Sequence, residues 1–315
     1  MEFELRFTDK EITAWGEMGL MKRMLDCIGF DSALEAFDFP KPGSNRGYSP
    51  TQLLLQFMLS VWCGANRFEH SEVTRHDPVL QKFFGFKRMA NFKAIMRLFD
   101  KFDQATVMRV FGRLYRWFFG NLHIDHLTLD LDSTVMTRYG QQEGAACGYN
   151  PRKSGRNSHH PLMTFVADIR MIANLWLRPG NSHSANNVLA FLGDSLDKIG
   201  GKRVALLRAD SNFSDQTFLS ELDQRCMHYL IALRLNQPLQ RALVDQKAWW
   251  VLNDSLEIVA FDYQAPSWNR PRRVVVIRQK IVERADYRYG FTGYGTLAFI
   301  PGPCRLREPY QRIEV

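Results

Sequence analysis

The sequence is poor in cysteine, and the cysteines it has are far apart. There are five in 315 residues, and none stands at the close spacing typical of zinc sites or disulfide frameworks: Cys27, Cys63, Cys147, Cys226 and Cys304. The first residues lack the basic-then-apolar pattern of a signal peptide. No apolar run approaches the roughly 20 residues of a membrane-spanning helix. We therefore expect a cytoplasmic protein with reduced cysteines and no membrane partner.

Low-complexity tracts and internal repeats are also missing, and the composition is that of a globular protein. Hydrophobic residues make up 45% of the chain and charged residues 23%, enough for two or three packed units. Lys and Arg number 41 against 33 Asp and Glu, a net charge of +8. This excess favours a polyanionic partner such as nucleic acid, although many basic proteins bind none.

Residues 1–122 are predicted to form a helical N-terminal region. Ser49 followed by Pro50 is a typical helix start, and apolar residues then recur at helical spacing. Further apolar stripes follow, with basic residues around them: Arg88, Lys93, Arg97, Lys101, Arg109, Arg113 and Arg116. Two interpretations stay open, amphipathic helices with solvated basic faces or a helical DNA-binding module.

From His126 the pattern changes to that of an α/β core, which we assign to residues 123–235. Residues 126–133 alternate strictly, with Leu127, Leu129 and Leu131 on one face. Strands are then predicted at 162–169, 172–177, 203–209 and 228–233, and helices at 185–198 and 215–225. Residues 236–288 are rich in β-formers and are predicted to be a β-rich insertion. Residues 289–315 have turn-like Gly and Pro punctuation and are predicted to form a divergent C-terminal segment that packs poorly.

Aspartates on the predicted strands carry the first chemical signal. Asp130 and Asp132 share the strand face opposite the leucines, and Asp210 follows the strand that ends at residue 209. Buried carboxylates are costly unless they are paired, hydrogen-bonded or bound to a metal. Carboxylates on adjacent strands suit Mg²⁺ or Mn²⁺, and two such ions about 4 Å apart can assist displacement at phosphorus. The alternative for each residue is a turn or capping aspartate, such as an Asx-turn at Asp210.

The loop between the first two long core strands is basic. It runs over residues 148–161 and contains three cations among small residues: Arg152, Lys153 and Arg156. Because nucleic-acid phosphates are natural partners of such a loop, these residues, with His159 and His160, are predicted to bind nucleic acid. The alternative is a solvated basic loop. The two histidines are neighbours, which turns their rings apart on a strand, so we do not expect them to form a metal pair.

The chain resembles the DDE transposases of bacterial insertion sequences over residues from about 50 to 285, and the resemblance is specific over residues 127–235. The resemblance is carried by Asp132-Ser133-Thr134, Gly140-Gln141-Gln142-Glu143-Gly144, Gly148-Tyr149-Asn150-Pro151, Arg178-Pro179-Gly180-Asn181-Ser182-His183-Ser184 and Arg208-Ala209-Asp210-Ser211. It implies an RNase H-like fold with a β insertion, and a catalytic site of Asp, Asp and Glu that binds Mg²⁺ or Mn²⁺, two ions in an intact member. Asp132 matches the first aspartate, with Asp130 as the alternative, and Asp210 matches the second.

The third carboxylate of that family has no match in this chain. The family places a Glu on a helix after the insertion, within a Tyr, Arg, Glu, Lys pattern, whereas this sequence turns rich in Gly and Pro after Tyr289. Glu283, Glu308 and Glu314 are left as candidates without those surroundings. The resemblance therefore predicts a truncated or frameshifted copy that lacks transposition activity.

The function implied by the resemblance is metal-dependent cleavage and strand transfer of an insertion sequence. Its expected partners are double-stranded DNA, both the terminal repeats and the target, and a second copy of the chain in a synaptic complex at the nucleoid. Two rivals stay open. One is a non-catalytic DNA-binding remnant, which the missing Glu favours, and the other is a metal-dependent nuclease of the same fold.

Overall fold

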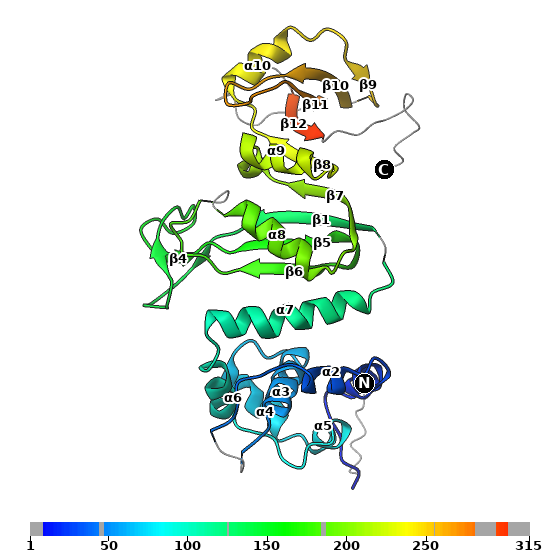
Figure 1. The fold of residues 1–315 in the computed structure, drawn as a ribbon, viewed down its shortest axis with the longest axis vertical. Helices are drawn as coiled ribbons and strands as arrows, with labels where there is room; N and C mark the ends of the chain where they lie inside the picture. Colours follow the sequence, from blue (N-terminus) through cyan, green and yellow to red (C-terminus); the bar gives the residue numbers. More distant parts are fainter. Residues whose placement is uncertain are drawn as a thin grey trace, which may run out of the picture. The chain divides into compact units, whose positions relative to one another are not determined.

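The computed structural model describes residues 9–43, 47–124, 126–183, 187–254, 256–280 and 294–301. The chain divides into two compact units, a helical one over Met1–Leu122 and a mixed α/β one over His123–Val315 (Figure 1). No helix in the described ranges is both long and apolar enough to span a bilayer.

The first unit is helical, as predicted. Polar side chains at the helix starts accept hydrogen bonds from first-turn amides, among them Ser49 from Gln52 and Asn91 from Ala94. Phe30, Leu59 and Leu80 are fully buried in its core. The elements are α1 (Met18–Cys27), α2 (Phe30–Glu35), α3 (Pro50–Trp62), η1 (Phe68–His70), α4 (Ser71–Arg75), α5 (Pro78–Phe83), α6 (Phe92–Phe99) and α7 (Gln104–Gly120).

The second unit is built on five strands and two helices close to their predicted positions. The strands are β1 (His126–Ser133), β5 (Leu162–Val166), β6 (Met171–Trp176), β7 (Arg203–Ala209) and β8 (Tyr229–Leu233). They lie in the order β6-β5-β1-β7-β8, with β5 antiparallel to its neighbours and β7 and β8 parallel to β1. This order and direction are those of an RNase H-like sheet, so the predicted fold class is confirmed.

The leucine face of β1 packs as its alternation predicts. Leu127, Leu129 and Leu131 are at most 3% exposed, whereas Asp132 on the other face is exposed. Leu131 shares one core cluster with Phe191 from α8 (Val188–Lys198) and Phe218 from α9 (Gln216–Gln224). Figure 1 shows α8 lying across strands β1, β5 and β6. These helices therefore cover the apolar face of the sheet.

The insertion extends this sheet instead of forming a separate β unit. It contains a helix that was not predicted, α10 (Gln237–Val244), followed by β9 (Trp250–Val251), β10 (Leu256–Tyr263) and β11 (Arg272–Lys280). The expectation of turns after residue 289 is wrong for residues 294–301, because they form strand β12 (Tyr294–Pro301). Strand β12 pairs antiparallel with β8 on one side and β11 on the other. It joins the insertion to the core in one nine-stranded sheet.

A buried charged cluster also ties the insertion to the core. Arg272 at the start of β11 is 6% exposed and donates to Asp223 of α9 (2.6 Å) and to the hydroxyl of Tyr229 (2.8 Å). Asp223 also pairs with Arg270. Burial raises the pKa of Tyr229, so its hydroxyl stays protonated and able to donate.

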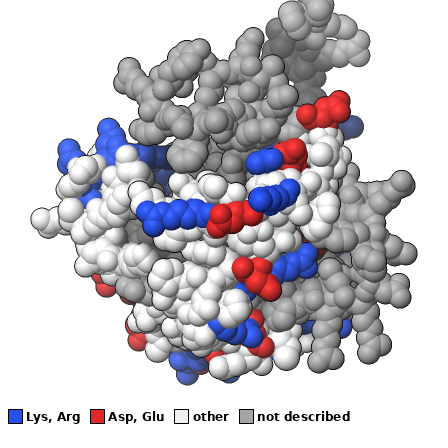
Figure 2. Space-filling model, turned by 90° about the horizontal axis from the view of Figure 1, so that it is seen from above, with Lys and Arg blue, Asp and Glu red and all other residues white. Residues whose placement is uncertain are grey.

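Figure 2 shows one face of the molecule, where Lys and Arg side chains lie beside Asp and Glu.

A small sheet stands between β1 and β5 in the chain. Its strands are β2 (Met136–Thr137), β3 (Ala146–Cys147) and β4 (Asn157–His159), and the predicted basic loop joins β3 to β4. Gly148 and Gly180 meet at its edge, where an added Cβ on Gly148 would lie 2.1 Å from the Gly180 carbonyl oxygen. A Cβ on Gly180 would lie 2.2 Å from Oγ of Ser158. Both positions therefore require glycine.

Candidate functional site

Two aspartates stand at the carboxyl ends of neighbouring parallel strands. The last residue pair between β1 and β7 is Leu131 with Ala209. The next residues along the two chains are Asp132 and Asp210. Neighbouring strands lie about 4.8 Å apart, so the two residues occupy adjacent backbone positions. The carboxyl ends of parallel strands are where polar ligands collect in α/β sheets. The two sequence-predicted carboxylates thus share one edge of the sheet.

Asp132 is exposed, and its carboxylate makes few hydrogen bonds. Its Oδ1 accepts a hydrogen bond from the backbone amide of Ser133 (2.7 Å). Within the described residues its other oxygen has no hydrogen-bond partner. A carboxylate in this state can accept a cation without giving up an existing ion pair.

Asp210 is half-buried and forms the Asx-turn that was the alternative at this position. It caps η3 (Ser211–Phe213), since its Oδ1 accepts from the amide of Asn212 (2.9 Å) and its Oδ2 from the Asn212 side chain (2.8 Å). Arg234, just after β8, in turn donates to Oδ1 of Asn212 and to Oγ of Ser211. This relay fixes the Asp210 carboxylate from one side, and each of its oxygens keeps a lone pair.

Asp130, the alternative to Asp132, is engaged in an ion pair. Arg208 lies directly opposite on β7 and donates Nε (2.6 Å) and Nη2 (2.7 Å) to the two Asp130 oxygens. The hydrogen bond to Asp130 raises the pKa of the Arg208 guanidinium. A bidentate pair of this kind occupies both carboxylate oxygens. Of the two β1 aspartates, Asp132 is the better placed to bind a metal ion.

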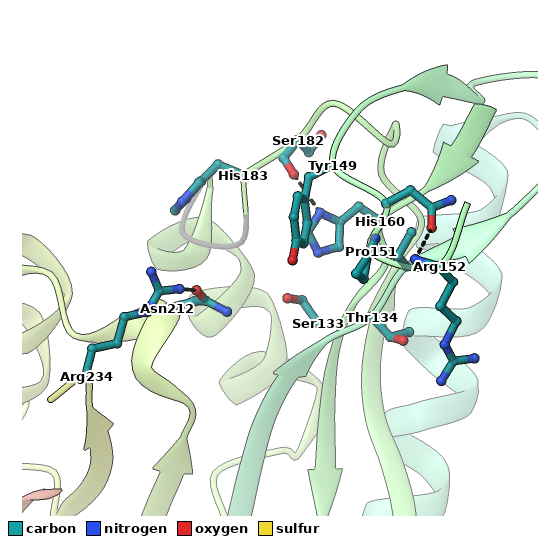
Figure 3. Close-up of a pocket in the computed structure, with 12 residues that line it drawn as sticks. Ser133, Thr134, Tyr149, Pro151, Arg152, His160, Ser182, His183, Asn212 and Arg234 are labelled. Carbon is teal, nitrogen blue, oxygen red and sulfur yellow. Dashed lines mark hydrogen bonds between the residues drawn. The ribbon is translucent and has the colours of Figure 1, made fainter. Parts of the chain in front are cut away.

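A polar pocket of about 590 Å³ adjoins this edge of the sheet (Figure 3). Asp132 and Asp210 do not line it, but their neighbours Ser133 and Asn212 do. A smaller pocket of about 260 Å³ shares His183, Asn212 and Arg234 with it. The larger pocket is lined by Ser133, Thr134, Val135, Tyr149, Asn150, Pro151, Arg152, His160, Ser182, His183, Asn212 and Arg234.

Two cations line this pocket on opposite sides, Arg152 and Arg234, although the Arg152 side chain points away from the other labelled residues in Figure 3. The buried Asn150 side chain accepts from the amides of Arg152 (3.1 Å) and Lys153 (3.0 Å), which shapes the start of the basic loop. Lys153 and Arg156 are exposed on the same loop. No carboxylate in the described part of the chain pairs with the three loop cations. The pocket and loop together can attract an anion.

The two predicted histidines are buried, at 4% and 8% exposure. His159 accepts from Nε of Arg138 (2.9 Å) at Nδ1, so its Nε2 donates to the carbonyl oxygen of Glu143 (3.0 Å). His160 donates from Nδ1 to the carbonyl oxygen of Ser182 (2.7 Å), and its ring lines the pocket. These contacts hold the small sheet in place. Of the two, only His160 lies at the pocket.

Sequence reasoning missed Arg234 and Asn212 as site residues. Arg234 follows a predicted strand, in the same way that Asp210 follows its strand, so position at a strand end was the available signal. Within the described ranges, no three or more Asp, Glu, His or Cys side chains are grouped closely enough to hold a metal ion. The three remaining glutamate candidates, Glu283, Glu308 and Glu314, lie outside the described residues.

Comparison with known proteins gives one family. The model of the family described as transposase DDE domain group 1 matches residues 1–298. A chain in the cryo-EM structure of the piggyBac transposase synaptic complex with hairpin DNA is 12% identical, with a TM-score of 0.44. That similarity covers 90% of this chain and 60% of the piggyBac chain, so this chain spans less than two thirds of that chain's length. No curated protein sequence matches the chain.

Proposed function

This chain belongs to the transposase DDE domain group 1 family, and from that membership we propose that it cleaves and joins DNA with the help of a divalent metal ion bound by Asp132 and Asp210. The DNA substrates would be the ends of a transposable element and a target duplex. Two copies of the chain would bring the two ends together.

The position of Asp132 and Asp210 is the observation that carries this proposal. They follow the last pair of the β1–β7 ladder at the same edge of the sheet. Their donor atoms are carboxylate oxygens, the ligands that Mg²⁺ and Mn²⁺ prefer. Asp132 is exposed, and Asp210 is held by Asn212 through bonds that leave lone pairs for a cation. The residues present therefore fit a divalent metal ion.

A bound ion would neutralise charge on the phosphodiester and stabilise the leaving oxygen. The side chains around the pocket would act on the DNA itself. Arg152 and Arg234 would bind backbone phosphates from the two sides of the pocket, and Asn150 would hold the loop that carries Arg152. The complete site of this family uses two ions and a third carboxylate, for which Glu283, Glu308 and Glu314 are the candidates.

The test uses a plasmid that carries the gene between its own flanking sequences. Asp132→Asn and Asp210→Asn are expected to lower the rate of cleavage at the element boundary at least about 100-fold in Mg²⁺ or Mn²⁺. Asp262→Asn is the matched control, because Asp262 is an exposed strand aspartate of the same unit. Cleavage by either site variant at the wild-type rate would refute the assignment.

A second candidate function is DNA binding without cleavage. It is supported by the described residues, in which two carboxylates but no third are brought to this edge of the sheet. On this alternative the wild-type chain retards the plasmid DNA in a gel but leaves it uncut in Mg²⁺ and in Mn²⁺. Nicked DNA without joined products would instead indicate a nuclease of the same fold.

A further inference from the structure

A groove on the helical unit is lined by charge of one sign. It encloses about 580 Å³ and is lined by four cations from three segments of the chain: Arg75, Arg88, and Arg97 with Lys101. No aspartate or glutamate is among the described residues that line it. By contrast, basic and acidic side chains lie next to each other on the face seen in Figure 2. The groove is therefore a local concentration of positive charge.

The loop that carries Arg88 is fixed by helix α3. Gln56 is fully buried, donates to the carbonyl oxygen of Ala90 (2.6 Å) and accepts from the amide of Ala90 (2.8 Å). Gln52, one turn earlier, donates to the carbonyl oxygen of Arg88 (2.8 Å). Moving the loop would leave a buried amide side chain unsatisfied, which is costly. These hydrogen bonds therefore hold the loop against α3.

Two more side chains hold the residue after Arg88. Tyr48 donates its hydroxyl (3.2 Å) and Arg75 its Nε (3.3 Å) to the carbonyl oxygen of Met89. The guanidinium of Arg88 then lies over the Tyr48 ring, 4.8 Å from its centroid, as a cation–π contact. A cation preorganised in this way loses little freedom when it binds an anion.

Helix α6 supplies part of the lining at helical spacing. Asn91, Ala94, Arg97 and, past the helix end, Lys101 all line the groove. The eight residues of α6 span about 12 Å, a length over which one strand of DNA presents more than one phosphate. The charge of Arg75 is offset by Glu72 at 2.7 Å. Arg88, Arg97 and Lys101 supply the other three positive charges of the groove.

We infer that this groove binds the phosphate backbone of one strand of duplex DNA, at a site separate in sequence and in lining from the pocket at the strand ends. The contacts come from Arg88, Arg97 and Lys101 and do not depend on base identity. The inference rests on the proposed function, because that function makes duplex DNA the anionic partner.

The test is a salt titration of DNA binding by the full-length chain in EDTA, so that cleavage does not occur. The probe is a fluorescent 30-base-pair duplex. Replacing Arg88, Arg97 and Lys101 by alanine should lower the slope of log K against log salt by about 2.7, since each phosphate contact contributes about 0.9. Between 50 and 200 mM salt, wild-type affinity should then fall about 40-fold further than that of the variant.

The control removes the same charge from exposed positions of the same unit that do not line the groove: Arg23, Arg67 and Arg113. Its slope should stay within 0.5 of the wild-type value, and melting curves should show all three proteins folded. Equal losses of slope in both triple variants, or none in the groove variant, would overturn the inference. Displacement of DNA from the groove by poly-glutamate at equal charge concentration would also overturn it, in favour of an acidic protein partner.

The outcome is separable from that of the proposed function. If the groove variant binds as the wild type does and still cleaves, the groove assignment fails and the catalytic proposal stands. If Asp132→Asn cleaves at the wild-type rate while the groove variant has a lower slope of log K against log salt, the catalytic proposal fails and the groove assignment stands. A wild-type chain that binds no duplex at all would overturn both.

Discussion

Replacing Asn212 by alanine is expected to weaken metal binding at Asp210 without unfolding the chain. The Asn212 side chain donates to Oδ2 of Asp210 (2.8 Å) and accepts from Arg234, so the substitution breaks both links of the relay. The backbone amide of residue 212 keeps its bond to Oδ1 (2.9 Å). The carboxylate would therefore stay in place but lose the contact that fixes its rotation.

The expected size of the effect follows from two independent estimates. A hydrogen bond to a charged group contributes about 1.5–3 kcal/mol, and because Asn212 and Asp210 are only half-buried we take the lower end. Loss of a group that orients a metal ligand typically costs about 10–100-fold in metal affinity, which corresponds to about 1.4–2.8 kcal/mol. The two ranges overlap, and we expect a weakening of about 10-fold or slightly more.

The assay is thermal unfolding over a Mn²⁺ titration, because a ligand that binds the folded state raises Tm with its concentration. Asn212→Ala should need about 10 times more Mn²⁺ than the wild type for half of the full rise in Tm. Asn236→Ala is the matched control, since Asn236 caps α10 by accepting from the amide of Leu239 (3.1 Å). The control should lower Tm in the absence of metal and leave the Mn²⁺ midpoint unchanged. An unchanged or lower midpoint in Asn212→Ala would refute the reasoning, because the donor would then compete with the metal.

Three other predictions follow from the same structure. Arg152→Ala with Arg156→Ala should lower the slope of log K against log salt for duplex DNA by about 1.8, and an unchanged slope would remove the basic loop from the interface. Gly180→Ala should destabilise the chain in a melting curve, because its Cβ would overlap Ser158 at 2.2 Å; a wild-type Tm would contradict that packing. Burial raises the pKa of Asp194, but hydrogen bonds from Lys198, Trp176 and Asn174 outweigh it and hold the pKa below the ordinary 3.8. This stabilisation is present above pH 3.8 and lost as the pH falls through the folded-state pKa, so the stability deficit of Asp194→Asn in urea unfolding should shrink below about pH 4.

The core of the second unit could be predicted because its signals are local. The alternation over residues 126–133 shows both that β1 is a strand and which face it buries. In the strands and helices after it, up to residue 233, apolar residues also recur at the spacing of the element, and each element ends at polar residues. The order of these elements along the chain predicts the sheet. The family resemblance, drawn from the same residues, is confirmed by membership over residues 1–298.

Elements fixed by distant partners were missed. Strand β12 contains Gly295 and Pro301, which predict turns, but pairing with β8 and β11 on both sides outweighs that local preference. Helix α10 was hidden within a β-rich stretch, although Asn236 followed two residues later by Pro238 is a helix start.

The site was predictable in part for the same reason. Strand position indicated Asp132 and Asp210, whereas the ion pair that engages Asp130 depends on β1–β7 register, which the sequence does not encode locally. The relay through Asn212 and Arg234 likewise depends on side-chain contacts between η3 and the end of β8. The groove on the helical unit depends on residues as far apart in the sequence as Pro40 and Lys101 coming together.

The most direct test of the central claim is a crystal structure of the chain soaked with Mn²⁺, with anomalous differences collected at the manganese edge. We expect an anomalous peak about 2 Å from a carboxylate oxygen of Asp132 and also about 2 Å from one of Asp210, and we expect no such peak in crystals of Asp210→Asn. A peak bound by Asp130, or no peak at the ends of β1 and β7 at millimolar Mn²⁺, would contradict the central claim.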